Sequence, residues 1–172
     1  GLLGEAFALF SEDERAMRIV AEAMVELGEG EATELVARPE TEAEYMELAR
    51  RKTGVLFRAA AELGAVAGGA DAFTVESLGD YAERVGVAFQ IRDDVLDATA
   101  DADALGKPTG QDAEMDRPSL VQVTGLSPDV ANERARRQSD RALSALAAAD
   151  TEEVDAVDYL QDLAEFVVVR DR

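Results

Sequence analysis

Apolar residues recur every three or four positions along most of the chain, the spacing that places them on one face of an α-helix. Between residues 12 and 28 the positions that follow this spacing are Ala16, Ile19, Val20, Ala23, Met24 and Leu27. We predict a helix there that closes at Gly28 and Gly30, because glycine commonly ends helices.

A second helix is predicted from a capping box, a pattern in which a threonine and a glutamate three residues later satisfy the first free backbone amides. Thr41 and Glu44 have this spacing. We predict that the helix runs from there to about Ala67, because Gly68 and Gly69 follow.

The rest of the chain is also typical of helices. A third helix is expected to start between residues 71 and 74 and to reach about residue 99, before a polar stretch over residues 100–118. Ser127 with Pro128, and later Thr151, predict two further helix starts. No strand-like alternation is sustained, so we predict one all-α domain over residues 1–172.

The composition adds an unusual charge. The chain has 37 acidic and 17 basic residues, a net charge of -20, yet 47% of its residues are hydrophobic. Acids interleaved with helical apolar spacing indicate a folded protein from a concentrated-salt cytoplasm, such as that of a halophilic archaeon. A basic footprint for nucleic acid or an anionic membrane is not present.

The residue types narrow the chemistry further. Cysteine and histidine are both lacking, which excludes disulfides, thiol nucleophiles and zinc sites, so any metal must be held by oxygen. No apolar run approaches the roughly 20 residues of a membrane span, and a cytoplasmic protein is expected. The first residue is Gly1, which indicates either methionine removal or a chain that begins within a longer protein.

The most specific pattern lies in the third predicted helix. Gln90, Asp93, Asp94 and Asp97 stand at i, i+3, i+4 and i+7 and therefore share one narrow face. Three like charges on one stripe favour a cation, and magnesium takes one or two protein carboxylates together with water and phosphate oxygens. The alternative is an acidic, solvated helix face in an aspartate-rich chain.

The neighbours of the stripe are mostly core residues, Phe89, Ile91, Val95 and Leu96. Tyr81, Val85, Ala88 and Val95 are expected to pack on the other side. Gly86, one turn before Gln90, is expected to leave room for a bulky ligand.

Lysine is nearly absent, because the 17 basic residues include only Lys52 and Lys107. Lysine suits phosphate as a compact, mobile point charge. The alternative is two leftover surface lysines.

Three ordered motifs together resemble the trans-isoprenyl diphosphate synthases, the polyprenyl synthetase family. They are Lys52-Thr53-Gly54, Phe89-Gln90-Ile91-Arg92-Asp93-Asp94-Val95-Leu96-Asp97 and Gly106-Lys107-Pro108-Thr109-Gly110-Gln111-Asp112. The segments over residues 4–7 and 28–31 also resemble that family, so the similarity covers nearly the whole chain. It implies an isoprenoid synthase helical bundle and condensation of an allylic diphosphate (dimethylallyl, geranyl or farnesyl) with isopentenyl diphosphate.

The resemblance also implies roles for individual residues. The aspartates of the stripe would hold Mg²⁺ against the allylic diphosphate, and Lys52 and Lys107 would bind that diphosphate. Arg117, with Pro118 and Ser119, stands where the family usually has a glycine, a lysine and a threonine, and it is either a further diphosphate ligand or a solvated loop arginine. Thr53 and Gln90 would turn oxygen atoms toward the allylic cation. A homodimer with interface helices near residues 1–38 is expected.

The sequence departs from the family in one major respect. No second Asp-Asp-x-x-Asp motif precedes residue 89, although the family has two that face each other. The chain is therefore interpreted as the C-terminal half of a synthase. Two alternatives remain, a non-catalytic or regulatory subunit of such a synthase and a terpene-cyclase-like relative.

Overall fold

The computed structural model of the protein describes residues 13–36, 39–104, 125, 127–149, 151 and 154–169. These residues form helices and short connections, without a strand among them, which confirms the all-α fold class. The elements are α2 (Glu14–Val36), α3 (Glu42–Ala49), the π-helical segment η1 (Arg50–Gly54), α4 (Val55–Ala67), α5 (Ala72–Ala104), α7 (Pro128–Ala148) and α8 (Val154–Val169). None of the described helices is both long and apolar enough to cross a membrane.

The helix starts follow the capping residues of the sequence. Thr41 and Glu44 form the predicted reciprocal capping box, and Ser127 accepts a hydrogen bond from the backbone of Val130 with Pro128 at the first helical turn. The side chain of Asp71 accepts from the amide of Thr74 over 2.7 Å and so opens α5. These predicted starts are confirmed.

The predicted end of the first helix was wrong, because α2 continues through both glycines to Val36. Gly30 is buried, and a Cβ atom there would stand 2.9 Å from the Cβ of Arg51. The small residue therefore lets α2 approach η1 closely and does not end the helix.

The second predicted helix reaches Ala67 as expected, but it contains a π-helical turn that the sequence did not reveal. In η1 the amide of Val55 bonds to the carbonyl of Arg50, five residues back. Such single turns occur often at functional sites, and this one contains Lys52 and Thr53.

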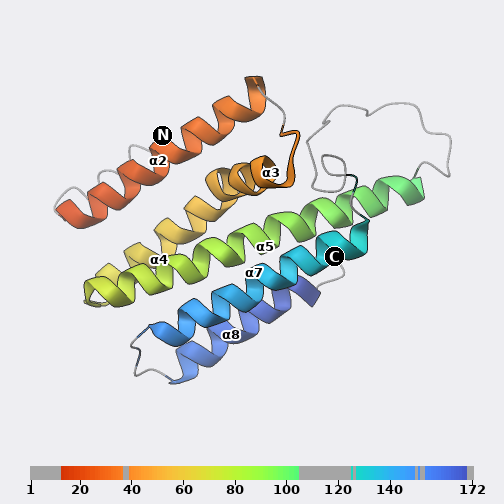
Figure 1. The fold of residues 1–172 in the computed structure, drawn as a ribbon. Helices are drawn as coiled ribbons and strands as arrows, with labels where there is room; N and C mark the ends of the chain where they lie inside the picture. The colour runs from red at the N-terminus through yellow and green to blue at the C-terminus, as the bar shows by residue number, and fades with distance from the viewer. Residues whose placement is uncertain are drawn as a thin grey trace.

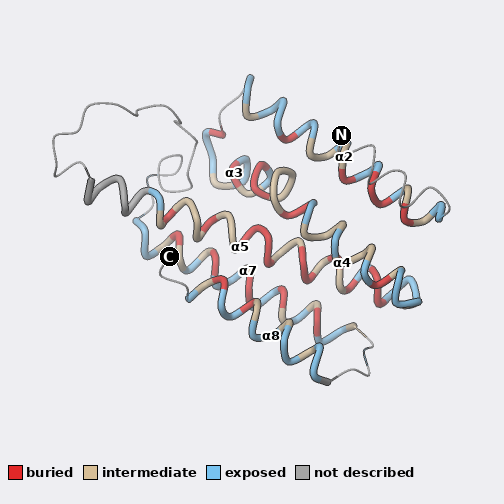
Figure 2. Tube along the Cα trace, turned by 180° about the vertical axis from the view of Figure 1, so that it is seen from behind, coloured by how far each residue is buried: buried red, intermediate tan, exposed pale blue. Residues whose placement is uncertain are grey.

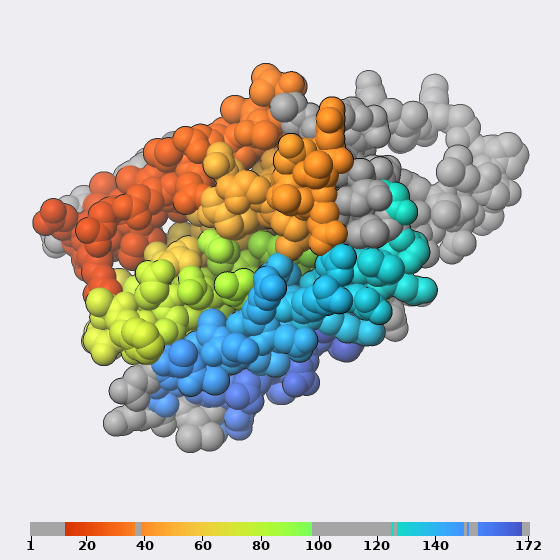
Figure 3. Space-filling model, viewed as in Figure 1, coloured from red at the N-terminus to blue at the C-terminus, as the bar shows by residue number. Residues whose placement is uncertain are grey.

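Helix α5 is the centre of the arrangement. It contacts α3, η1, α4, α7 and α8, while α2 packs on α4 and η1. Helices α2, α4, α5 and α7 lie side by side in this order, and α8 packs against both α5 and α7 (Figure 1). The atoms of α3, α5 and α7 meet on the face that Figure 3 shows.

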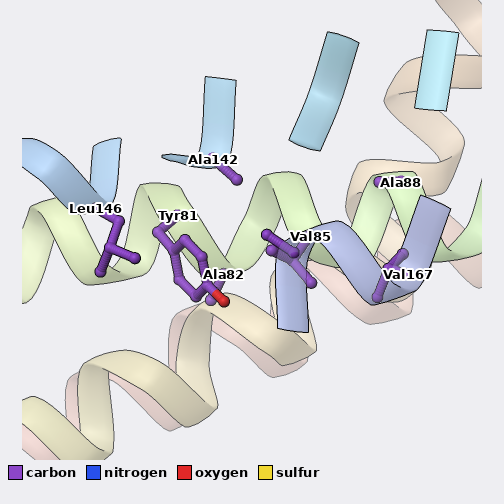
Figure 4. Packing of buried hydrophobic residues seen from close by; sticks show 8 residues of the cluster. Tyr81, Ala82, Val85, Ala88, Ala142, Leu146 and Val167 are labelled. Carbon is purple, nitrogen blue, oxygen red and sulfur yellow. The ribbon is translucent and has the colours of Figure 1, made fainter. Parts of the chain in front are cut away.

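Two buried clusters hold the row together. In one, side chains of α5 pack against those of α7 and α8 (Figure 4); its buried members are Tyr81, Ala82, Val85, Ala88, Ala142, Leu146, Ala164 and Val167. The other joins α3, α5 and α7 through Tyr45, Ala49, Val87, Ile91, Val95, Ala131 and Ala135. Burial of each large apolar side chain stabilises the fold by about 1.5–3 kcal/mol.

The core predicted around the acidic stripe is confirmed. Tyr81, Val85, Ala88 and Val95 are all buried, and Ile91 is completely so. Helix α5 is buried or half-buried from residue 77 to residue 96, whereas α7 and α8 each have exposed positions along their length (Figure 2). These buried residues fix the rotation of α5 and thereby the direction in which Gln90 and Asp94 point.

Candidate active site

A pocket of about 280 Å³ lies where α2, α3, η1 and α5 meet. Its lining consists of Glu31, Glu34, Tyr45, Leu48, Ala49, Lys52, Thr53, Gln90 and Asp94. The structure therefore brings together four of the residues that the sequence singled out, Lys52, Thr53, Gln90 and Asp94. They come from two segments about forty positions apart in the sequence.

A row of hydrogen bonds crosses the floor of this pocket. The hydroxyl of Thr53 donates to Oε1 of Gln90 over 2.7 Å, and Nε2 of Gln90 donates to Oδ1 of Asp94 over 2.9 Å. The hydroxyl of Tyr45 donates to the other carboxylate oxygen, Oδ2 of Asp94. We call Thr53, Gln90, Asp94 and Tyr45 the polar row.

Asp94 has an unusual electrostatic environment. Burial raises the pKa of its carboxyl group to about 6, although the hydrogen bonds from Tyr45 and Gln90 act to lower it. The nearby carboxylates of Asp93 and Asp97 raise the pKa further. The stripe thus concentrates negative charge in a partly buried place, which a bound cation would stabilise.

Lys52 is paired with carboxylates from α2. Its Nζ atom forms a close ion pair with Glu34 and lies 3.6 Å from Glu31. The side chains of Lys52 and Glu34 are 21% and 22% exposed, so a ligand can still reach them from the pocket. The predicted phosphate-binding ammonium is therefore held at the pocket wall by a neighbouring helix.

The other two aspartates of the stripe lie outside this lining. Asp93 is half-buried and Asp97 is exposed, on the same side of α5 as Asp94. Within the described residues no three acidic side chains converge closely enough to enclose an ion. The donor set nevertheless fits magnesium, because it offers only oxygen ligands and magnesium needs just one or two protein carboxylates.

Three sequence predictions have other outcomes. Lys107 and Arg117 lie outside the described residues. The expectation that Gly86 leaves room for a ligand was wrong, because a Cβ there would stand 3.0 Å from the ring of Phe57 and 3.1 Å from the Cα of Gly54. Gly86 instead lets α5 approach Gly54 and Phe57 closely.

Sequence reasoning missed two polar residues of the lining, Tyr45 and Glu34, as well as the apolar Leu48 and Ala49. Tyr45 precedes Lys52 and Thr53 by seven and eight positions, a spacing that returns to the same helix face. That spacing could have identified Tyr45. Glu34 gave no comparable pattern, since its partner lies on another helix.

A second pocket of about 290 Å³ lies between α2, α4 and the start of α5. Its lining alternates arginines with glutamates, and Arg58 there is already paired with Glu62 and Glu76. None of the sequence-predicted site residues lines it, so we place the candidate site at the first pocket.

Comparison with known proteins shows the family of the chain. The family model described as Polyprenyl synthetase matches residues 2–164. The chain belongs to this family. It is 30% identical over 179 residues to the geranylgeranyl diphosphate synthase of Methanosarcina mazei, covering 95% of this chain and 54% of that protein. The chain thus spans about half the length of this curated relative.

Solved structures of the polyprenyl synthetase family have the same architecture. The geranylgeranyl pyrophosphate synthetase from the archaeon Geoglobus acetivorans superposes with a TM-score of 0.77 at 28% identity, covering 97% of this chain and 63% of that chain. The polyprenyl synthase of Caulobacter crescentus, complexed with calcium and isoprenyl diphosphate, gives 0.80 at 29% identity, covering 98% and 63%. The isoprenoid synthase helical bundle expected from the sequence is therefore confirmed.

Proposed function

We propose that this chain forms part of a magnesium-dependent prenyltransferase that condenses an allylic diphosphate with isopentenyl diphosphate. The observation that carries the proposal is the convergence of Lys52, Thr53, Gln90 and Asp94 on one pocket. Relatives named as geranylgeranyl and short-chain isoprenyl diphosphate synthases support the reaction class.

The charge of the pocket supports a requirement for a divalent cation. Its lining has three carboxylates, of Glu31, Glu34 and Asp94, against the single ammonium of Lys52. A diphosphate adds further negative charge, so it would bind poorly without a cation. Bound Mg²⁺ would supply Lewis-acid stabilisation of the departing diphosphate, held by the Asp93, Asp94 and Asp97 stripe.

Residues of the chain would act on both sides of the carbon–oxygen bond that breaks, the departing diphosphate and the allylic carbon. The carbon–oxygen bond of the allylic diphosphate breaks and its electron pair leaves with the diphosphate, which Lys52 stabilises. The double bond of isopentenyl diphosphate then attacks the allylic carbon, and loss of a proton restores a double bond. Thr53 and Gln90 would offer oxygen atoms to the positive charge, and Lys107 and Arg117 would add cations to the diphosphate.

The chain spans about half of its relatives, so we propose that it supplies the C-terminal half of the synthase, as one domain of residues 1–172. Helices near residues 1–38 would contribute to a homodimer. The net charge of -20 supports a concentrated-salt cytoplasm, such as that of a halophilic archaeon. Arg58 is an example of one cation paired with several carboxylates: its guanidinium nitrogens lie 2.6 Å from a carboxylate oxygen of Glu76 and 2.6 Å from one of Asp80.

Prenyl transfer in molar potassium chloride with Mg²⁺ tests the activity, using labelled isopentenyl diphosphate and a series of allylic diphosphates. Longer prenyl products would support the enzyme. If isopentenyl diphosphate is not consumed but an allylic diphosphate is, the proposal gives way to a cyclase. A non-catalytic subunit would bind diphosphate without turnover until a partner polypeptide is added.

Asp93 provides a direct test of the metal assignment. We expect Asp93→Ala to abolish Mg²⁺-dependent binding of an allylic diphosphate, because the stripe loses one of its carboxylates. Isothermal calorimetry with and without Mg²⁺ measures this. Asp155→Ala, an exposed aspartate on α8, is the matched control. Unchanged affinity in Asp93→Ala would contradict the assignment.

A further inference from the structure

Tyr45 has no role in the chemistry described so far, yet it is among the most buried large side chains of the protein. It is 2% exposed and packs with Ala49, Val87 and Ile91 in the cluster that joins α3, α5 and α7. Its hydroxyl nevertheless reaches the pocket and donates to Oδ2 of Asp94. A rigid, buried ring thus presents one polar atom to the acidic stripe.

The polar row has a direction that follows from which groups can donate. Both oxygens of the Asp94 carboxylate accept, one from Tyr45 and one from the amide nitrogen of Gln90. Gln90 therefore turns its carbonyl oxygen toward Thr53, and the hydroxyl of Thr53 must donate to it. The proton of Thr53 is thereby committed, and its lone pairs are left for a ligand in the pocket.

Loss of the tyrosine hydroxyl would disturb this order. A carboxylate turns easily about its last torsion, which has broad, roughly two-fold minima. Tyr45 holds Asp94 from α3, and Gln90 holds it from one turn away on α5 itself. Without the bond from α3, the carboxylate can turn, and the amide of Gln90 can reverse with it.

We propose that Tyr45 is a positioning residue for the reaction. It fixes the carboxylate of Asp94 and, through Asp94, the orientation of Gln90 and the hydroxyl direction of Thr53. This inference rests on the proposed prenyltransferase function. It assigns Tyr45 no contact with substrate, so its effect must appear through the other three members of the row.

The test compares the variants Tyr45→Phe and Tyr81→Phe in the full-length natural protein. Tyr81 is an ideal control because it is 3% exposed and its hydroxyl donates to the backbone oxygen of Leu160, away from the pocket. Both variants lose one buried hydroxyl and keep the ring. Only Tyr45→Phe removes a bond to the acidic stripe.

We expect Tyr45→Phe to lower kcat by about tenfold or more, the size of losing one hydrogen bond to a charged group. The Mg²⁺ concentration for half-maximal rate should rise severalfold, with KM for isopentenyl diphosphate unchanged. Tyr81→Phe should change neither kcat nor the Mg²⁺ requirement. A Tyr45→Phe protein with the wild-type Mg²⁺ requirement and kcat would overturn the proposal.

A double-mutant cycle separates positioning from simple loss of structure. Thr53→Val removes the other end of the polar row, so its effect on kcat should be less than additive with Tyr45→Phe if both act through Asp94 and Gln90. Fully additive effects would overturn the proposal.

Binding of inorganic pyrophosphate with Mg²⁺, measured by calorimetry, gives a readout that does not depend on turnover. Wild-type protein that binds pyrophosphate but forms no prenyl product would count against the proposed function alone. Tyr45 would then be judged by binding: weaker affinity in Tyr45→Phe than in Tyr81→Phe supports its role, and equal affinities overturn it.

Discussion

The contact at Gly86 makes a sharp prediction about how α5 is held against the helix that carries Lys52. A methyl group at this position would meet the Cβ and ring of Phe57 and the backbone of Gly54 at 3.0–3.1 Å. Backbone and the inner atoms of a side chain cannot swing aside as a flexible chain end can. The two helices would have to separate by a few tenths of an ångström.

The magnitude follows from two opposing effects of Gly86→Ala. Overpacking costs about 1–3 kcal/mol, while alanine in a helix interior gains about 1 kcal/mol over glycine. We expect net destabilisation of about 0–2 kcal/mol. Gly64→Ala in α4 is the matched control, because nothing lies within 4 Å of its Cβ position. It should stabilise the protein by about 0.5–1 kcal/mol.

Urea unfolding followed by far-UV circular dichroism at constant salt measures both variants. The difference in unfolding free energy between Gly86→Ala and Gly64→Ala isolates the steric cost, about 1–3 kcal/mol. Gly86→Ala should also reduce prenyl transfer, since Gly54 adjoins Thr53 and Gly86 lies one turn before Gln90. If Gly86→Ala stabilised the protein as much as Gly64→Ala, the close helix contact would be refuted.

Two further predictions concern the hydroxyl of Tyr81 and the guanidinium of Arg58. Burial raises the pKa of Tyr81 to about 12, so the folded protein retains a proton that the unfolded chain loses above about pH 10. Stability should therefore fall as pH rises from about 10 to 12, and Tyr81→Phe should remove about 2–3 kcal/mol of that fall in alkaline unfolding curves. Replacing Arg58 with Gln should destabilise the protein by about 1–2 kcal/mol, because the carboxylates of Glu62, Glu76 and Asp80 lose their shared cation. Molar potassium chloride should recover part of this loss by screening, and equal losses at low and high salt would contradict that explanation.

The elements could be predicted from the sequence because their determinants are local. The capping box of Thr41 and Glu44 and the proline after Ser127 act within one turn, so their effect can be inferred without knowing the fold. The π-helical turn of η1 could not be inferred from the sequence. The hydrogen bond from the Val55 amide to the carbonyl five residues back depends on how the segment packs against other helices. Gly30 was misinterpreted for the same reason, because its partner Arg51 lies on another element.

Sequence spacing could predict only those residues of the site that share one face of a single helix. Gln90 and Asp94 share such a face, and a hydrogen bond indeed joins them. Gly86 also lies on that face, and a glycine that admits a ligand has the same sequence pattern as one that admits a neighbouring helix. This face of α5 borders both the pocket and a neighbouring helix. Gln90 accepts a hydrogen bond from Thr53 in the pocket, while Phe57 of α4 lies against Gly86.

The ion pairs of Lys52 predict that the proposed cation and the ammonium would act together on a diphosphate. The ammonium is paired with Glu34 and lies near Glu31, so an arriving diphosphate would exchange one anion for another. That exchange gains little by itself, because the displaced carboxylates remain in the pocket and repel the new anion. In the proposed function, a divalent cation on the stripe that contains Asp94 would offset this repulsion. The contributions of metal and lysine to diphosphate binding should therefore be coupled, so that either one alone accounts for much less than half of their joint effect.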